Sequence, residues 1–208
     1  MRSAPPAHRS GADSSYLIHR RHNKILLQQD PVPASSDSLI TFDTDTNLEW
    51  LSLTKTVNLS ISDVRNGAGG YTTIYGFRYA NSAELQALWN HAGITRFAPN
   101  QPVPVPDGNS AGIKTLIDWM GGATNYPTTG TIQTQGIFMV PPAPGHPGVG
   151  QLWFFTNNPA GSYATTDIFP NVPQGVTPDD YRSSALASYL VRNHEPPTPP
   201  RNLRVDEK

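Results

Sequence analysis

The order of apolar and polar residues along the chain predicts its secondary structure. Between residues 39 and 53, two runs of alternating apolar and polar residues flank the polar segment Thr44–Asn47. This arrangement predicts a β-hairpin whose turn lies at the polar segment. Asn47 suits the end of that turn, because asparagine adopts a positive φ at modest cost.

Three later segments have the features of helices. Ser60 and Asp63 have the spacing of a capping box and predict a short helix that begins after Ser60. Asn81 or Ser82 is expected to cap a second helix over residues 83–92, where apolar residues recur at i, i+3, i+4 and i+7. Gly93 is the expected C-terminal cap. A similar stripe predicts a third helix over residues 111–120, which two glycines end.

Short strands are expected in the remaining apolar segments. β-Branched and aromatic residues predict strands over 71–79, 136–140, 151–156 and 185–192, and the loops at 98–110 and 141–150 are rich in turn residues. The 21 prolines and 17 glycines fit many turns and long loops. The predicted fold class is therefore α+β: an opening hairpin, two or three short helices, and antiparallel strands with long Pro/Gly-rich loops.

The length of 208 residues fits one domain with extended ends. We expect a single α+β domain over residues 39–193, a flexible basic N-terminal arm over 1–38 and a proline-rich tail over 194–208. The arm carries positive charges but no apolar stretch of the length that an export signal needs. No run of about 18 apolar residues predicts a membrane span.

Composition excludes several classes of chemistry. The net charge of −1 gives no support to a nucleic-acid partner held by phosphate neutralisation. The absence of cysteine excludes disulfides, thiolate metal sites and cysteine nucleophiles. The sequence contains no phosphate-binding loop or dinucleotide fingerprint, so no cofactor is expected.

No group of residues has the spacing of a catalytic site, because the acids are scattered and no Gly-x-Ser-x-Gly motif occurs. We therefore predict a protein that is not an enzyme. His91 is expected to interact with the C-terminal end of the second helix. Asp43, Asp45 and Asn47 have the 1, 3, 5 spacing of a calcium loop, although Leu48 stands where that loop needs glycine. A hairpin turn whose side chains bond its own backbone is the preferred interpretation, and a calcium site is the alternative.

The aromatic residues divide into two groups. The four tryptophans lie in predicted helices and strands and are expected in the core. Tyr126, Tyr163 and Tyr181 lie in loop-rich stretches, where they either hold loops against the core or stack on sugars or a partner protein. Together with Gln101 and Asn109 of the 98–110 loop, these tyrosines are the candidate ligand-binding residues.

Four blocks of the sequence carry a resemblance to a known family. Residues 39–54, 59–64, 75–93 and 183–192, which include the strings LEWLSL and GFRYANSAELQALWNHAG, resemble a group of bacterial PEP-CTERM exported proteins in the same order. The blocks fall within residues 39–192, about three-quarters of the chain. The resemblance implies an extracellular or cell-surface protein associated with polysaccharide and biofilm.

The same hairpin and helix are similar, more distantly, to the C-terminal domain of collagen-like bacterial adhesins, which has the layout of C-type lectins. This resemblance implies a C-type-lectin-like fold, but the residues that bind calcium and sugar in such lectins are missing here. We therefore expect a non-enzymatic secreted or cell-surface domain for extracellular matrix, adhesion or self-assembly, whose partners are extracellular polysaccharide or copies of itself. The alternative is a polysaccharide-acting hydrolase.

Overall fold

The structure of the protein is a computed structural model that describes residues 19–21, 24–30, 37–95, 97–99, 110–140, 147–157, 161–168 and 177–195. All structural statements below refer to these residues. Gln101, Asn109 and residues 141–146 lie outside them, so the predictions made for these positions stay predictions.

Most strands belong to two six-stranded sheets. The first sheet has the order β1-β2-β3-β4-β13-β5, and its strands are His19–Arg21 (β1), Lys24–Gln29 (β2), Ile40–Asp43 (β3), Leu48–Leu51 (β4), Leu190–Asn193 (β13) and Arg78–Tyr79 (β5). The second sheet has the order β12-β9-β10-β11-β6, with β8 also paired to β9, and its strands are Ala187–Ser188 (β12), Thr131–Met139 (β9), Pro147–Phe155 (β10), Tyr163–Ile168 (β11), Phe97–Pro99 (β6) and Thr124–Tyr126 (β8).

Three α-helices and short 3₁₀ turns connect the strands. The α-helices are Ile61–Arg65 (α1), Ser82–His91 (α2) and Ser110–Met120 (α3). The 3₁₀ turns are Leu53–Lys55 (η1), Ala68–Gly70 (η2) and Pro178–Asp180 (η4). The α+β class and the three predicted helices are therefore confirmed. None of the described helices is long and apolar enough to cross a membrane.

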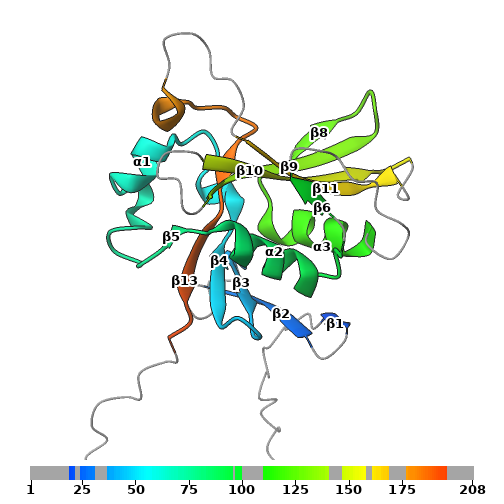
Figure 1. Cartoon of the computed structure of the whole chain (residues 1–208), viewed down its shortest axis with the longest axis horizontal. Coiled ribbons are helices and arrows are strands. Elements are labelled where there is room, and N and C mark those ends of the chain that lie inside the picture. Colours follow the sequence, from blue (N-terminus) through cyan, green and yellow to red (C-terminus); the bar gives the residue numbers. More distant parts are fainter. Residues whose placement is uncertain are drawn as a thin grey trace, which may run out of the picture.

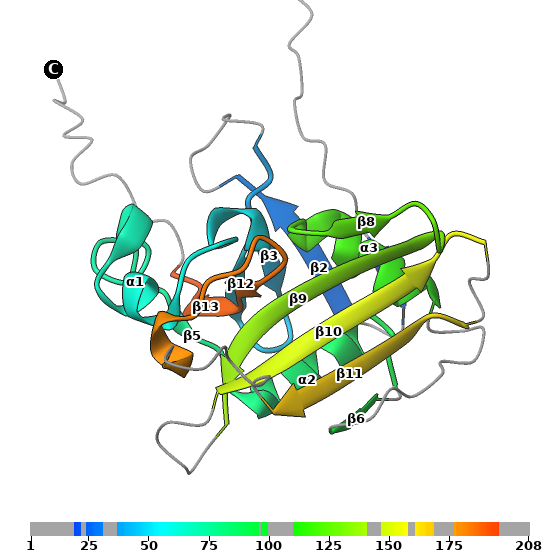
Figure 2. The ribbon, with the colours of Figure 1, turned by 90° about the horizontal axis from the view of Figure 1, so that it is seen from above.

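The sheets and helices form layers. In Figure 1 the second sheet lies at the top, α2 and α3 lie beneath it, and β2, β3 and β4 lie at the bottom. Both helices contact strands of both sheets. Viewed from above in Figure 2, β9, β10 and β11 cross over the two helices. Val149, near the start of β10, packs against Ile61 of α1.

The main core lies between the sheets and contains residues from every layer. Trp50 of β4, Trp89 of α2 and Leu116 of α3 are fully buried, and they pack in one cluster with Phe138 and Leu152 of the second sheet. The prediction that Trp50 and Trp89 belong to the core is confirmed. Burying side chains of this size is the main favourable contribution to folding.

The chain closes on itself through β13. This strand pairs antiparallel with β4, where Val191 lies opposite Trp50, and it also pairs with β5. The predicted hairpin is confirmed as β3 and β4, and Asn47 ends its turn with a φ of 56°. The last strand of the domain therefore lies beside the hairpin that opens the 39–193 domain predicted from the sequence.

Asn81, one of the two caps expected from the sequence, caps α2. The side chain of Asn81 accepts a hydrogen bond from the Glu84 amide, and the Glu84 carboxylate accepts one from the Asn81 amide, each at 2.9 Å. Both guanidinium nitrogens of Arg78 also donate to Glu84. Partial burial alone would raise the pKa of Glu84, but these hydrogen bonds outweigh burial and lower it.

One glycine allows close packing between the second sheet and the closing segment. A Cβ atom at Gly136 would lie 2.6 Å from the ring of Tyr189, which is fully buried. This position lies opposite Gly150 of β10. The aromatic ring therefore rests directly against the backbone of β9, which a larger residue at position 136 would prevent.

Several sequence predictions need correction. Only Arg78–Tyr79 of the expected strand over 71–79 is a strand, because Gly76 has a φ of 71° and the preceding residues form turns. Residues 147–150, expected in a loop, begin the long strand β10. The expected flexible arm over 1–38 contains β2, which pairs with β3 and contributes the buried Leu26 to the core.

Candidate ligand-binding face

The outer face of the second sheet, which points away from α2 and α3, carries aromatic side chains. Successive side chains of a strand point to opposite faces, so Leu152 and Phe154 of β10 face the helices and the main core. Trp153 and Phe155 consequently lie on the outer face. The register places Tyr163 of β11 opposite Trp153, on the same side.

A fourth aromatic residue extends this set across the sheet. Tyr126 of β8 lies opposite Thr131 of β9, which in turn lies opposite Phe155. Tyr126 is 37% exposed, one of the most exposed large apolar side chains of the described residues. We call the outer side chains of Tyr126, Trp153, Phe155 and Tyr163 the aromatic face.

Three of the four rings of the aromatic face, those of Trp153, Phe155 and Tyr163, form one contacting group. The Trp153 and Tyr163 rings stack with centroids 5.6 Å apart and planes 27° apart, and the Phe155 and Tyr163 rings lie 5.8 Å apart. All three side chains are only partly exposed, and partial burial raises the pKa of the Tyr163 phenol. These contacts fix the rings in position, which reduces the conformational entropy lost when a ligand binds.

A short hydrogen-bond network fixes the tryptophan. The indole Nε1 of Trp153 donates to Oε1 of Gln151 at 3.2 Å, and Nε2 of Gln133 donates to the same oxygen at 3.0 Å. The amide nitrogen of Gln151 has no hydrogen-bond partner within the described part of the chain, and Gln151 is partly exposed. It is therefore a donor available to a ligand that rests on the rings.

The aromatic face lacks formal charge. On β8, β9 and β10 the outer positions around the rings carry glutamine or threonine, and on β11 Thr165 lies beside Gln151. Within the described part of the chain, none of these neighbours of the rings is Asp, Glu, Lys or Arg. Aromatic rings surrounded by neutral amides and hydroxyls suit an uncharged ligand with both apolar and hydroxyl groups.

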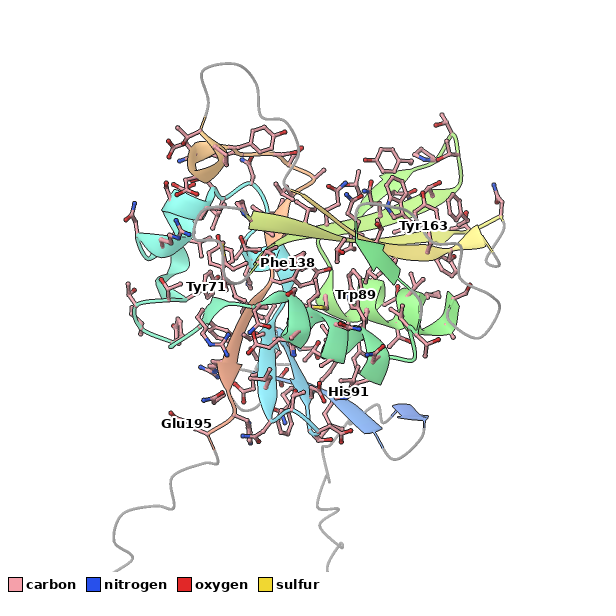
Figure 3. All side chains as sticks on the ribbon, in the orientation of Figure 1. Tyr71, Trp89, His91, Phe138, Tyr163 and Glu195 are labelled. Carbon is pink, nitrogen blue, oxygen red and sulfur yellow. The ribbon has the colours of Figure 1, made fainter. Side chains whose placement is uncertain are left out.

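The structure brings together two of the three candidate tyrosines. Tyr126 and Tyr163 lie in strands rather than loops and share the aromatic face. Tyr181 packs against Ile137, Val149 and their neighbours, at the opposite end of β9 and β10. Figure 3 shows Tyr163 on the second sheet, well away from His91 at the far end of α2.

Sequence reasoning missed Trp153 and Phe155. Trp153 was expected in the core, yet it is only partly buried and lies on the outer face. The signal was the alternation in Gln151–Phe155, where glutamine marks the same face as Trp153 and Phe155. Three successive aromatic residues hide this alternation, because the apolar residues occupy both faces.

The proposed calcium ligands do not converge. The Asp43 carboxylate is fully buried and accepts a hydrogen bond from the Asp45 amide at 3.1 Å, as the preferred turn interpretation requires. Both Asp43 oxygens also lie within 2.8 Å of Nδ1 of His91. Asn47 instead donates to the carbonyl of His194. No group of three described acids or histidines could hold a metal ion.

His91 therefore does more than lie near the end of α2. It connects the end of β3 to that helix through a short contact between Nδ1 and the buried carboxylate of Asp43, and its side chain is 10% exposed. Its other ring nitrogen, Nε2, lies 3.9 Å from Oδ2 of Asp45. Local sequence patterns could not indicate this pairing, because His91 and Asp43 lie 48 positions apart.

A second polar cluster surrounds Glu49 of β4. Its two carboxylate oxygens accept hydrogen bonds from Nε of Arg192 and Nδ1 of His194, each at 2.6 Å. His194, for which the sequence indicated no partner, also stacks on Phe42. A pocket of about 470 Å³ lies beside this cluster and is lined by Glu49, Ile74, Tyr75, Gly76, Arg192, Asn193 and Glu195.

The described residues define an α+β protein with two sheets, a helical layer between them and an uncharged aromatic face on the outer sheet. No protein-family model matches the chain, and no curated protein or solved structure is significantly similar to it.

Proposed function

We propose that this chain is a non-enzymatic module of the bacterial cell surface or extracellular matrix that adheres to polysaccharide through its aromatic face. The observation that carries the proposal is the stacked pair of Trp153 and Tyr163, partly exposed and bordered by the amide of Gln151. Sugar rings have apolar C–H faces that stack on aromatic rings and hydroxyls that bind amides.

Two further observations support the proposal. The blocks that resemble PEP-CTERM exported proteins form the hairpin, α1, α2 and the closing strand, so they belong to one folded unit. The pairing of β4 with β13 brings the opening hairpin and the closing strand together. This is the layout that the resemblance to collagen-like adhesins and C-type lectins implies, and on it we base the proposal of a C-type-lectin-like fold.

Retention on polysaccharides tests the proposal. The wild-type protein is expected to be retarded in gels that contain neutral polysaccharide, and Trp153→Ala is expected to weaken binding about 10-fold, the loss of roughly 1.4 kcal/mol. Val140→Ala is the control, because Val140 is 39% exposed but follows the end of β9 that lies away from the aromatic face. Equal retention of the wild type and Trp153→Ala on every polysaccharide tested would refute the proposal.

Copies of the chain are the second partner that we propose. Ile74 and Tyr75 are adjacent, 76% and 53% exposed, and border the pocket that Glu195 also lines. Exposed neighbouring apolar side chains favour contact with another protein surface. Sedimentation across a range of concentrations is expected to show self-association that Ile74→Ser weakens. A monomer at every concentration would contradict this part of the proposal.

One observation favours the alternative of a polysaccharide-acting hydrolase. Glu49 and Glu195 line the same pocket, and paired carboxyl groups are the catalytic groups of most glycoside hydrolases. Both oxygens of Glu49 are already bound to Arg192 and His194, which favours a structural role. Release of reducing sugar that Glu195→Gln abolishes would establish the hydrolase instead.

A further inference from the structure

The positions of the four aromatic residues indicate how a polysaccharide would lie on the sheet. Trp153, Phe155 and Tyr163 form one group on β10 and β11, and Tyr126 stands apart on β8. Strand β9 separates the two and contributes Thr131 and Gln133 to the face between them. The aromatic groups therefore follow one another across the strands rather than along a single strand.

The spacing sets the length of ligand that can touch both groups. Neighbouring strands lie about 4.8 Å apart, so Tyr126 and Phe155, two strand spacings apart, are separated by roughly 10 Å. Tyr163 lies one strand further, at roughly 14 Å across the sheet from Tyr126. The C–C and C–O bond lengths of a pyranose ring let each unit advance an extended chain by roughly 5 Å, close to one strand spacing. Three to four units would therefore span the face.

The charge and shape of the site restrict the class of chain. Between the two aromatic groups, the described side chains Thr131 and Gln133 of β9 are uncharged and buried, so they offer no partner to the carboxylates of an acidic polysaccharide. In Figure 2 no described helix or strand lies over the part of β10 that carries Trp153 and Phe155, so none forms a wall that would enclose a coiled chain there. A flat, extended chain makes the largest contact with such a surface.

We propose that the aromatic face binds a linear, uncharged, β-linked glycan of three to four units, which runs across β11, β10, β9 and β8. The inference rests on the proposed function, since it names the ligand class of the same site. Trp153 and Tyr163 hold one end of the glycan, the amide of Gln151 donates to a hydroxyl beside them, and Tyr126 stacks on the far end.

Cello-oligosaccharides from the disaccharide to the hexasaccharide are the probes, with binding followed by tryptophan fluorescence and calorimetry. For the wild type, affinity is expected to rise from the disaccharide to the tetrasaccharide and then level off. Tyr126→Ala is expected to remove most of that rise, a loss of about 5- to 10-fold for the tetrasaccharide, and to leave disaccharide binding unchanged. Trp153→Ala is expected to weaken every length.

The comparison ligands and controls separate the possible failures. Malto-oligosaccharides, which coil, and oligogalacturonates, which are charged, are expected to bind more weakly than cello-oligosaccharides of equal length. Val140→Ala is expected to bind like the wild type, and circular dichroism confirms that each variant folds. The inference is overturned if affinity does not depend on oligosaccharide length, or if Tyr126→Ala weakens the binding of all lengths equally. The proposed function would still stand in that case if retention on polysaccharide depends on Trp153. Retention that does not depend on Trp153 overturns both.

Discussion

Removing the imidazole of His91 should destabilise the fold strongly, because the buried Asp43 carboxylate would then keep only the hydrogen bond from the Asp45 amide. The Asp43 carboxylate has no exposed surface, and both its oxygens lie within 2.8 Å of Nδ1 of His91. Removing one partner of a buried ion pair costs about 3–5 kcal/mol, mostly because the remaining charge stays desolvated. We therefore expect His91→Ala to lower the free energy of unfolding by about this amount.

Thermal and urea unfolding, each followed by tryptophan fluorescence, measure the effect. For a domain of this size, 1 kcal/mol corresponds to a shift in melting temperature of about 2–4 °C, so His91→Ala should melt roughly 6–20 °C below the wild type. The urea midpoint should fall while the slope of the transition stays constant, since the surface exposed on unfolding hardly changes.

Two variants control for loss of contacts in general. In His194→Ala the carboxylate of Glu49 keeps Arg192 as its partner, so a smaller loss of about 1 kcal/mol is expected. Replacing both Asp43 and His91 by leucine removes the charge together with its partner and should cost less than His91→Ala alone. The reasoning is refuted if His91→Ala is no more destabilising than His194→Ala, or if the double leucine variant is the less stable of the two.

Three further predictions concern the fold. Leu26→Ala should lower the free energy of unfolding by about 2–4 kcal/mol in chemical unfolding, because β2 contributes Leu26 to the core. An unchanged free energy of unfolding would show that β2 does not belong to the folded domain. Gly136→Ala should cost about 1–3 kcal/mol, since its Cβ would meet the ring of Tyr189; a melting temperature equal to that of the wild type would contradict this packing. Glu84 has a lowered pKa, so its stabilising effect is present above its unfolded pKa and is lost as pH falls through the folded value. The difference in melting temperature between the wild type and Glu84→Gln should therefore be largest near neutral pH and shrink in acid, and a constant difference would argue against the ionised capping contact with Asn81.

Local patterns in the sequence were enough to predict the hairpin and the helices. The capping pairs Ser60 with Asp63 and Asn81 with Glu84 both form in the structure, because a capping box depends on residues three positions apart. The apolar stripe of α2 is likewise a property of neighbouring turns, and its members Leu85, Leu88 and Trp89 are buried.

The candidate site could be predicted only in part. Tyr126 and Tyr163 were identified from their residue type and polar surroundings, but their shared face depends on the pairing of β8, β9, β10 and β11. Trp153 and Phe155 could be assigned to the same face only from the strand register. A change of one residue in register would turn the same side chains toward the helices.

Turns, caps, amphipathic stripes and the α+β class therefore follow from local sequence patterns. Contacts between distant residues depend instead on how the strands and helices pack. That packing places β2 in the first sheet and pairs Asp43 with His91 and Glu49 with His194. It also places four aromatic side chains on one face. The physical reason is that periodicity shows which residues of one element share a face, whereas strand register and burial decide which elements that face meets.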